Sequence, residues 1–187
     1  MLDWVVEMLK MTISDWKARI DKQFLAGLSN VVVIGGNKKT SEITNFEFCL
    51  TPEKIEVYDF VDPPVKEEIT ERKFVCDISY KMYDEYLKKD LNSRQAAFVN
   101  NYDGADNHCI SYFHHYVRNK KHCINVYVRS MDYKRNFVYD CQTFNLAYLE
   151  VFTELKEQYD EKVEKGYIRV FVFSLHVYSV LRVFIDT

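Results

Sequence analysis

The sequence predicts an α+β fold, because helical and strand-like hydrophobic patterns alternate along it in an irregular order. Segments 1–28, 78–91 and 140–158 place apolar residues at helical spacing, and several shorter runs rich in β-branched and aromatic residues indicate strands. The order lacks the regular strand–helix–strand alternation of a doubly wound sheet. With 187 residues, 48% of them hydrophobic, the chain can bury one sizeable core, and we expect a single domain over 1–187.

The three helical segments are amphipathic, so that one face of each can pack on the core. Their apolar positions are Trp4, Val5, Met8, Leu9, Trp16, Ile20, Phe24 and Leu28, then Ile78, Met82, Tyr86 and Leu87, then Phe144, Ala147, Tyr148, Val151, Phe152 and Leu155. The charged stretch 159–165 that follows the third helix predicts a solvated loop.

The strand-like runs are bounded by turn residues. They are 31–34, 46–50, 55–60, 95–101, 109–118, 122–130 and 168–175. Asn119-Lys120-Lys121 separates the fifth run from the sixth and predicts a hairpin. This hairpin brings Cys109 and Arg129 together from opposite ends of the two runs.

Composition narrows the possible environments and partners. The formal net charge is −3 with acids and bases interspersed, which does not indicate a nucleic-acid-binding surface. No apolar run approaches the length of a membrane span. The five cysteines are an odd number without short metal-type spacing, and no secretory signal pattern precedes them. We therefore expect reduced thiols in the cytoplasm, without a metal site.

Three separated motifs carry the chemistry: Cys109, Arg129-Ser130 and His176-Val177-Tyr178. A guanidinium near a thiol favours the thiolate, which is the nucleophilic form. Arginine and serine together can hold a phosphate through a charge-assisted fork and a hydroxyl. The pattern suggests covalent chemistry on a phosphorylated small molecule. The simpler alternatives are a buried core cysteine, an exposed strand end with a surface ion pair, and a half-buried aromatic pair.

At these residues the chain resembles the thymidylate synthase family, which includes the deoxycytidylate hydroxymethylases. The matching segments are Ser93-Arg94-Gln95-Ala96, Cys109 to Asp132, and Ser174 to Tyr178, within residues 80–178. The resemblance implies a thymidylate synthase-like mixed sheet flanked by helices. It also implies a cytoplasmic homodimer that acts in pyrimidine nucleotide biosynthesis.

The resemblance assigns a role to each matched residue. Cys109 corresponds to the thiolate that adds to C6 of a pyrimidine nucleoside monophosphate, so that C5 can accept the one-carbon unit of 5,10-methylenetetrahydrofolate. Arg129 and Ser130 correspond to the phosphate-binding pair. Arg94 corresponds to the first of two arginines that reach the phosphate of the partner subunit, and Gln95 replaces the second.

The remaining matched residues address the sugar, the folate and the base. His176 and Tyr178 correspond to the pair that hydrogen-bonds the sugar 3′-hydroxyl, and Asp132 to an aspartate that binds the pterin ring. Asp140 falls where thymidylate synthases carry an asparagine and the hydroxymethylases an aspartate. A carboxylate accepts from the N4 amine of cytosine, and a protonated carboxyl also donates to N3. Asp140 equally suits a helix N-cap or first turn.

These assignments predict a folate-dependent C5 one-carbon transferase, with dCMP hydroxymethylation preferred. The first alternative is a methyltransferase of the thymidylate synthase type, acting on dUMP. The second is a nucleotide-binding relative of the family without turnover.

Overall fold

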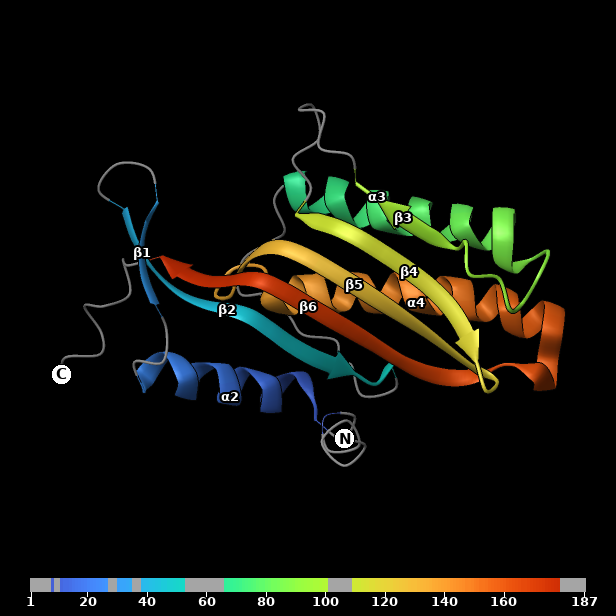
Figure 1. Ribbon diagram of the computed structural model, residues 1–187, viewed down its shortest axis with the longest axis horizontal. Coiled ribbons are helices and arrows are strands. Elements are labelled where there is room, and N and C mark those ends of the chain that lie inside the picture. Colours follow the sequence, from blue (N-terminus) through green and yellow to red (C-terminus); the bar gives the residue numbers. More distant parts are fainter. Residues whose placement is uncertain are drawn as a thin grey trace.

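A computed structural model describes Met8 and residues 11–26, 30–34, 38–52, 66–100 and 109–178 of the chain (Figure 1). These residues form three α-helices and one six-stranded sheet. The helices are α2 (Ile13–Leu25), α3 (Lys66–Met82) and α4 (Phe137–Tyr159). The strands are β1 (Asn30–Ile34), β2 (Lys38–Leu50), β3 (Ala97–Val99), β4 (Ile110–Arg118), β5 (Lys121–Asp132) and β6 (Glu164–Tyr178).

The sheet is mixed, with the strand order β1-β2-β6-β5-β4-β3. Strands β5 and β6 are parallel, and every other neighbouring pair is antiparallel. A parallel pair needs a crossover connection, which α4 supplies between β5 and β6. Helices packed on a mostly antiparallel mixed sheet make an α+β fold, as the sequence predicts.

The β4–β5 hairpin is confirmed, with a tighter turn than the sequence suggests. Arg118 pairs with Lys121, so only Asn119 and Lys120 form the turn. Both have positive φ angles, 50° and 65°. Two-residue turns of this kind match the right-handed twist of the flanking strands.

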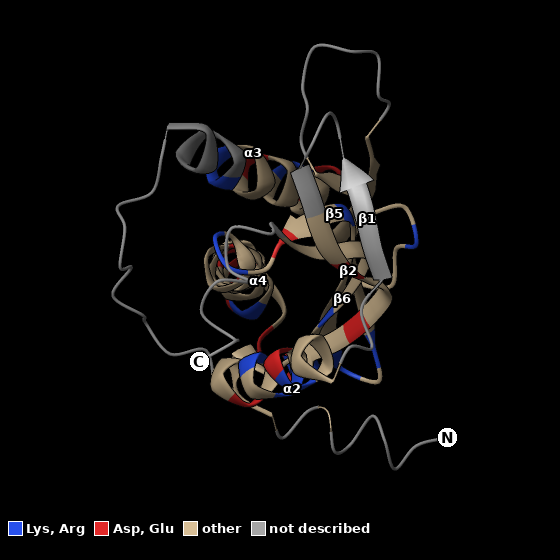
Figure 2. Ribbon diagram, turned by 90° about the vertical axis from the view of Figure 1, so that its left-hand side faces the viewer, with Lys and Arg blue, Asp and Glu red and all other residues tan. Residues whose placement is uncertain are grey.

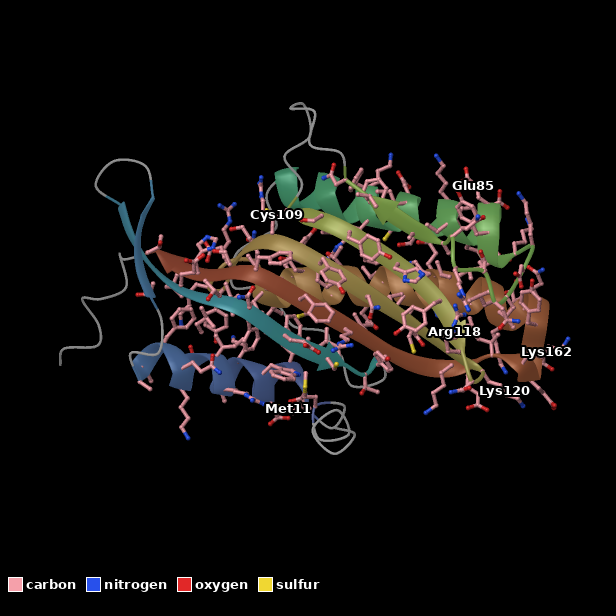
Figure 3. The ribbon with its side chains drawn as sticks, in the orientation of Figure 1. Met11, Glu85, Cys109, Arg118, Lys120 and Lys162 are labelled. Atoms are coloured by element: carbon pink, nitrogen blue, oxygen red, sulfur yellow. The ribbon has the colours of Figure 1, made fainter. Side chains whose placement is uncertain are left out.

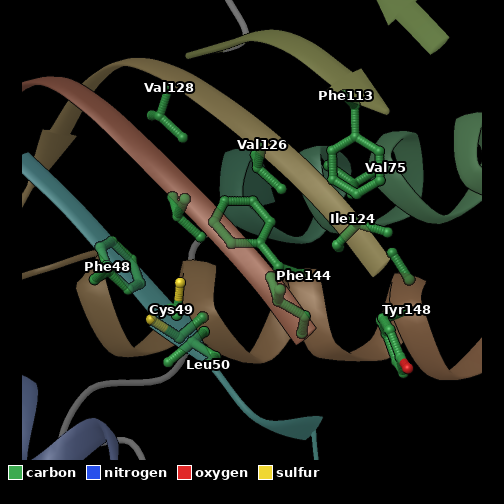
Figure 4. Close-up of a cluster of buried hydrophobic side chains, with 14 of the residues drawn as sticks. Phe48, Cys49, Leu50, Val75, Phe113, Ile124, Val126, Val128, Phe144 and Tyr148 are labelled. Carbon is green, nitrogen blue, oxygen red and sulfur yellow. The ribbon is translucent and has the colours of Figure 1, made fainter. Parts of the chain in front are cut away.

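All three helices pack on the same face of the sheet, and in the side view of Figure 2 α3 and α4 lie to one side of the strands. Phe48 on β2 connects two of the layers, because its ring contacts both Trp16 of α2 and Phe137 of α4. Phe113, Val126 and other side chains that alternate along the strands fill the space beneath α4 (Figure 4).

Thr12 sets the start of α2 through a reciprocal capping box with Asp15. Trp16, one turn further on, is buried and its Nε1 donates to the carbonyl oxygen of Cys49 at 2.9 Å. The indole therefore packs on the core without leaving its N–H unpaired. None of the described helices is long and apolar enough to cross a membrane.

Several boundaries differ from the sequence prediction. Helix α3 begins twelve residues before position 78 and continues into a π-helical turn, Tyr83–Leu87. The expected loop 159–165 is wrong in part, because only 160–162 forms a 3-10 turn and β6 already starts at Glu164. Glu164 and Lys165 are exposed and still pair with β5, so their charge does not prevent strand formation. The predicted strand 55–60 lies outside the described residues.

Candidate functional site

A small pocket opens where the start of β4 and the end of β5 meet the first turns of α4. It is lined by Cys109, Ile110, Val128, Tyr139, Asp140, Thr143 and Phe144. The pocket brings Cys109 and Asp140 to one place, although they come from a strand end and a helix. Its volume of about 10 Å³ is about that of one water molecule. A heterocycle would have to lie at its mouth or widen it.

Cys109 lies immediately before β4, with its side chain partly buried. Its carbonyl oxygen accepts from the backbone N–H of Arg129 at 2.7 Å, which places the two residues opposite each other at the open end of the hairpin. Figure 3 shows Cys109 and Arg118 at opposite ends of β4. Arg129 is exposed at this end of the sheet.

The other four cysteines lie in environments that disfavour a thiolate. Burial raises the pKa of Cys49 to about 12 and that of Cys76 to about 11. Burial also raises the pKa of Cys123, and raises that of Cys141 well above its usual value. A desolvated thiol resists ionisation because the charged form loses its hydration. These four thiols therefore stay protonated and poorly nucleophilic at neutral pH.

The Arg-Ser and His-Val-Tyr motifs lie side by side on the parallel strands β5 and β6. Ser130 is opposite Ser174, and Asp132 is opposite His176. Ser130 Oγ and His176 Nδ1 are 3.3 Å apart, and the His176 side chain is only 5% exposed. The serine hydroxyl and the imidazole thus form one hydrogen-bonded pair at the strand ends. The side chain of Tyr178 lies outside the described part of the structure.

Asp132 has a structural role in the turn that leads into α4. Its Oδ1 accepts from the backbone N–H groups of Lys134 at 3.1 Å and Arg135 at 3.2 Å. An aspartate that binds backbone donors two and three residues ahead stabilises a turn. Oδ2 is the oxygen that this arrangement leaves for a ligand.

Asp140 lies in the first turn of α4, and Asn136 is the N-cap residue. The backbone N–H of Asp140 donates to the Asn136 carbonyl oxygen at 2.7 Å. The N-cap reading is therefore wrong, whereas the first-turn reading agrees with the structure. A carboxylate in this turn interacts favourably with the helix dipole. The same helix end directs it into the pocket beside Cys109.

Arg94 lies well away from the Cys109 pocket of its own chain. It is exposed and precedes β3, whose Ala97 pairs with His114 near the middle of β4. His114 is five residues along the strand from Cys109, or about 17 Å at about 3.4 Å per residue. Arg94 lies beyond that point, away from the Cys109 pocket of its own chain.

Two residues that the sequence did not indicate, Tyr139 and Thr143, line the pocket, and Arg72 contacts both of them. Arg72 Nε donates to Thr143 Oγ1 at 3.3 Å, and its guanidinium carbon lies 4.1 Å from the centre of the Tyr139 ring. Helical spacing from Asp140 could have identified Thr143, since residues three positions apart share one side of a helix. Tyr139 directly precedes Asp140, so helical spacing gives no such signal for it. The sequence carries no such signal for Arg72 on α3.

The structure is similar to that of thermostable thymidylate synthase A from Bacillus subtilis. The TM-score is 0.67 at 12% sequence identity, and the match covers 90% of this chain and 80% of that protein. No protein-family model matches the sequence, and no curated protein matches it either. At this level of identity the similarity concerns the fold. The mixed sheet with helices on one face is therefore a thymidylate synthase-like fold.

Proposed function

We propose that this protein transfers a one-carbon unit to C5 of a pyrimidine nucleoside monophosphate, with dCMP hydroxymethylation as the preferred reaction. The observation that carries the proposal is the pocket in which Cys109 and Asp140 meet, within a thymidylate synthase-like fold. A thiol and a carboxylate at one pocket supply a nucleophile and a polar group that can orient a heterocyclic base.

In this proposal each residue acts on one part of the nucleotide. The Cys109 thiolate adds to C6, which makes C5 nucleophilic towards the one-carbon unit of 5,10-methylenetetrahydrofolate, the co-substrate. Asp140 accepts a hydrogen bond from the N4 amine of cytosine. The Ser130–His176 pair, with Arg129 and Tyr178, binds the phosphate and the sugar hydroxyl. The hydrogen bond between Ser130 and His176 holds these two groups in register.

The co-substrate has one matched ligand in the described residues. Asp132 Oδ2 can accept from a donor on the pterin ring, while Oδ1 keeps the turn in place. The three glutamates of the α3 region, Glu67, Glu68 and Glu71, belong to the segment whose side chains are not described. The residues present therefore fit a folate on the Asp132 side.

We also propose that the protein acts as a homodimer through the sheet face opposite the helices. Side chains on this face alternate with the buried ones beneath α3 and α4. They are Tyr112, His114, Tyr116, Tyr127, Tyr167, Arg169, Phe171 and Phe173. None of the described helices covers this face. An open, aromatic sheet face of this kind suits packing against its symmetry mate.

The side chains of this face are already ordered by contacts across the strands. Tyr127 stacks on Phe171 with ring centres 4.6 Å apart, and the guanidinium of Arg169 lies 4.6 Å from the Phe171 ring centre. Arg169 Nε also donates to Glu47 at 2.6 Å. Phe173 remains 49% exposed. A dimer would bury this phenylalanine, and it would give Arg94 a partner subunit whose phosphate it could contact.

The five free thiols support a reducing compartment, and we place the protein in the cytoplasm. Small-molecule nucleotides and folate are the partners that the proposal requires.

Product analysis tests the proposed reaction. The protein is incubated with methylenetetrahydrofolate and either dCMP or dUMP, and the products are identified by mass spectrometry, with Cys109→Ser as the inactive control. Hydroxymethyl-dCMP as the main product supports the proposal, whereas thymidylate from dUMP establishes the first alternative. Nucleotide binding without any product establishes the non-catalytic relative.

A further inference from the structure

Arg72 places a positive charge against two residues that line the Cys109 pocket, Tyr139 and Thr143. Two of its contacts, the Thr143 hydroxyl and the Tyr139 ring, are made with residues that line the pocket. These contacts hold the guanidinium between α3 and α4. Nη2 of the same side chain is buried and has no hydrogen-bond partner among the described residues.

A buried guanidinium donor without an acceptor is unfavourable, because it has lost its hydration and gained nothing in return. The planar guanidinium is fixed on one side by the bond from Nε to Thr143 and on its face by Tyr139. Its orientation is therefore set before any ligand arrives. A ligand atom that accepts from Nη2 would complete the hydrogen bonding of Arg72, and the bond would be charge-assisted.

The residues of α4 that Arg72 contacts indicate which end of a nucleotide it can reach. Tyr139 and Thr143 flank Asp140 on the first two turns of the helix, and all three line the pocket. The phosphate- and sugar-binding candidates Ser130 and His176 pair with each other on β5 and β6 instead. Arg72 therefore contacts the two residues that flank Asp140, at the base end of the proposed site.

We propose that Arg72 is a specificity-determining residue that donates from Nη2 to N3 of a cytosine ring while Asp140 accepts from the N4 amine. This inference rests on the proposed function and deepens it. Cytosine presents a donor at N4 and an acceptor at N3, so an acceptor next to a donor matches it. Uracil presents an acceptor at O4 and a donor at N3, so the same two groups oppose it at both positions. In this arrangement Arg72 supplies the donor for N3, so Asp140 acts only as an acceptor.

Isothermal titration calorimetry on the full chain tests this assignment with dCMP, dUMP and 2-deoxyribose 5-phosphate. Arg72→Met keeps an apolar stem against Tyr139 and removes the donor. We expect it to weaken dCMP binding about ten-fold or more, because a lost charged hydrogen bond has an effect of that size. Binding of 2-deoxyribose 5-phosphate should stay within about two-fold of the parent protein, because this ligand has no base for Arg72 to contact.

Two controls separate recognition from folding. Arg118→Met removes an arginine at the other end of β4 (Figure 3) and should leave all three affinities unchanged. Arg72→Lys keeps the charge but lacks the planar guanidinium that donates to Thr143 and to the ligand at the same time. It should fold normally and show a lower preference for dCMP over dUMP. In the parent protein, the guanidinium ¹⁵N signal of Arg72 should shift on addition of dCMP but not of 2-deoxyribose 5-phosphate.

The outcomes distinguish this inference from the proposed function. Normal dCMP binding by Arg72→Met, equal losses for dCMP and 2-deoxyribose 5-phosphate, or an unmoved Arg72 signal would overturn the role of Arg72 and leave the nucleotide site intact. Absence of any nucleotide binding by the parent protein would overturn both.

Discussion

His115 and His122 form a buried, stacked pair between β4, β5 and α4, and this pair makes the stability of the protein depend on pH. Both side chains are fully buried, and His115 Nδ1 and His122 Nε2 are 3.0 Å apart. The His122 ring also stacks on Tyr148, with 4.6 Å between the ring centres. Nε2 of His115 and Nδ1 of His122 have no partner within the described residues.

Burial disfavours the charged form of both imidazoles. Desolvation lowers the pKa of His122 from 6.5 to about 3. The pKa of His115 lies well below its usual value, mainly because of desolvation and to a smaller extent because of the neighbouring His122. In the unfolded chain both histidines titrate near pH 6.5. The unfolded state therefore binds more protons below that pH, and stability falls as the pH decreases from about 6.5 towards 3.

The size of this effect follows from the two pKa values. We consider one histidine that stays neutral in the folded state and titrates at about 6.5 in the unfolded state. Lowering the pH from 7.5 to 5.0 then reduces the free energy of unfolding by about 2 kcal/mol. The pair together costs about 4 kcal/mol if both stay neutral, a large part of the 5–15 kcal/mol typical of a folded domain. We expect urea denaturation at a fixed protein concentration to show this loss.

The His122→Phe variant isolates the contribution of one ring. Phenylalanine keeps a stacked aromatic ring next to Tyr148 but does not titrate, so the loss between pH 7.5 and 5.0 should fall to about half, or about 2 kcal/mol. His114→Gln is the comparison, because burial and then the charge of Arg118 also lower the pKa of the partly buried His114, though less than that of the pair. It should remove a smaller part of the pH dependence than His122→Phe. Equal stabilities of the parent protein at the two pH values would refute the reasoning, as would an undiminished pH dependence in His122→Phe.

Three further predictions concern the proposed site and assembly. Iodoacetamide at neutral pH should modify Cys109 faster than Cys49 or Cys76, and equal reactivity of the three thiols would reject the nucleophile assignment. Cys109→Ser should abolish turnover and leave the thermal unfolding temperature within a few degrees of that of the parent protein. Asp140→Asn should shift binding from dCMP towards dUMP by roughly ten-fold, because the amide can donate to O4, and an unchanged ratio in competition experiments would leave Asp140 with only its first-turn role. Sedimentation should show a dimer at micromolar concentration, and Phe173→Glu should dissociate it by burying a charge on the open face; a monomeric parent protein would contradict the proposed assembly.

Local patterns in the sequence determine most of the secondary structure of this protein. The hairpin of β4 and β5, the amphipathic helices α2 and α4, and the last strand all follow from hydrophobic spacing and turn residues. The spacing of Cys109 and Arg129 also predicts their neighbouring positions, because a hairpin of known turn brings its two ends together. These features depend on residues that are close in sequence.

The sequence alone does not determine which distant elements share a site. Asp140 and Cys109 meet in one pocket because α4 crosses over the β4–β5 hairpin, and Arg72 joins them because α3 packs against α4. The pairing of β6 with both β2 and β5 likewise places His176 beside Ser130. Each of these contacts joins residues more than thirty positions apart in the chain. These contacts are fixed by the packing of apolar faces. Because hydrophobic burial is non-directional, the hydrophobic pattern of one segment does not determine which other segment it packs against.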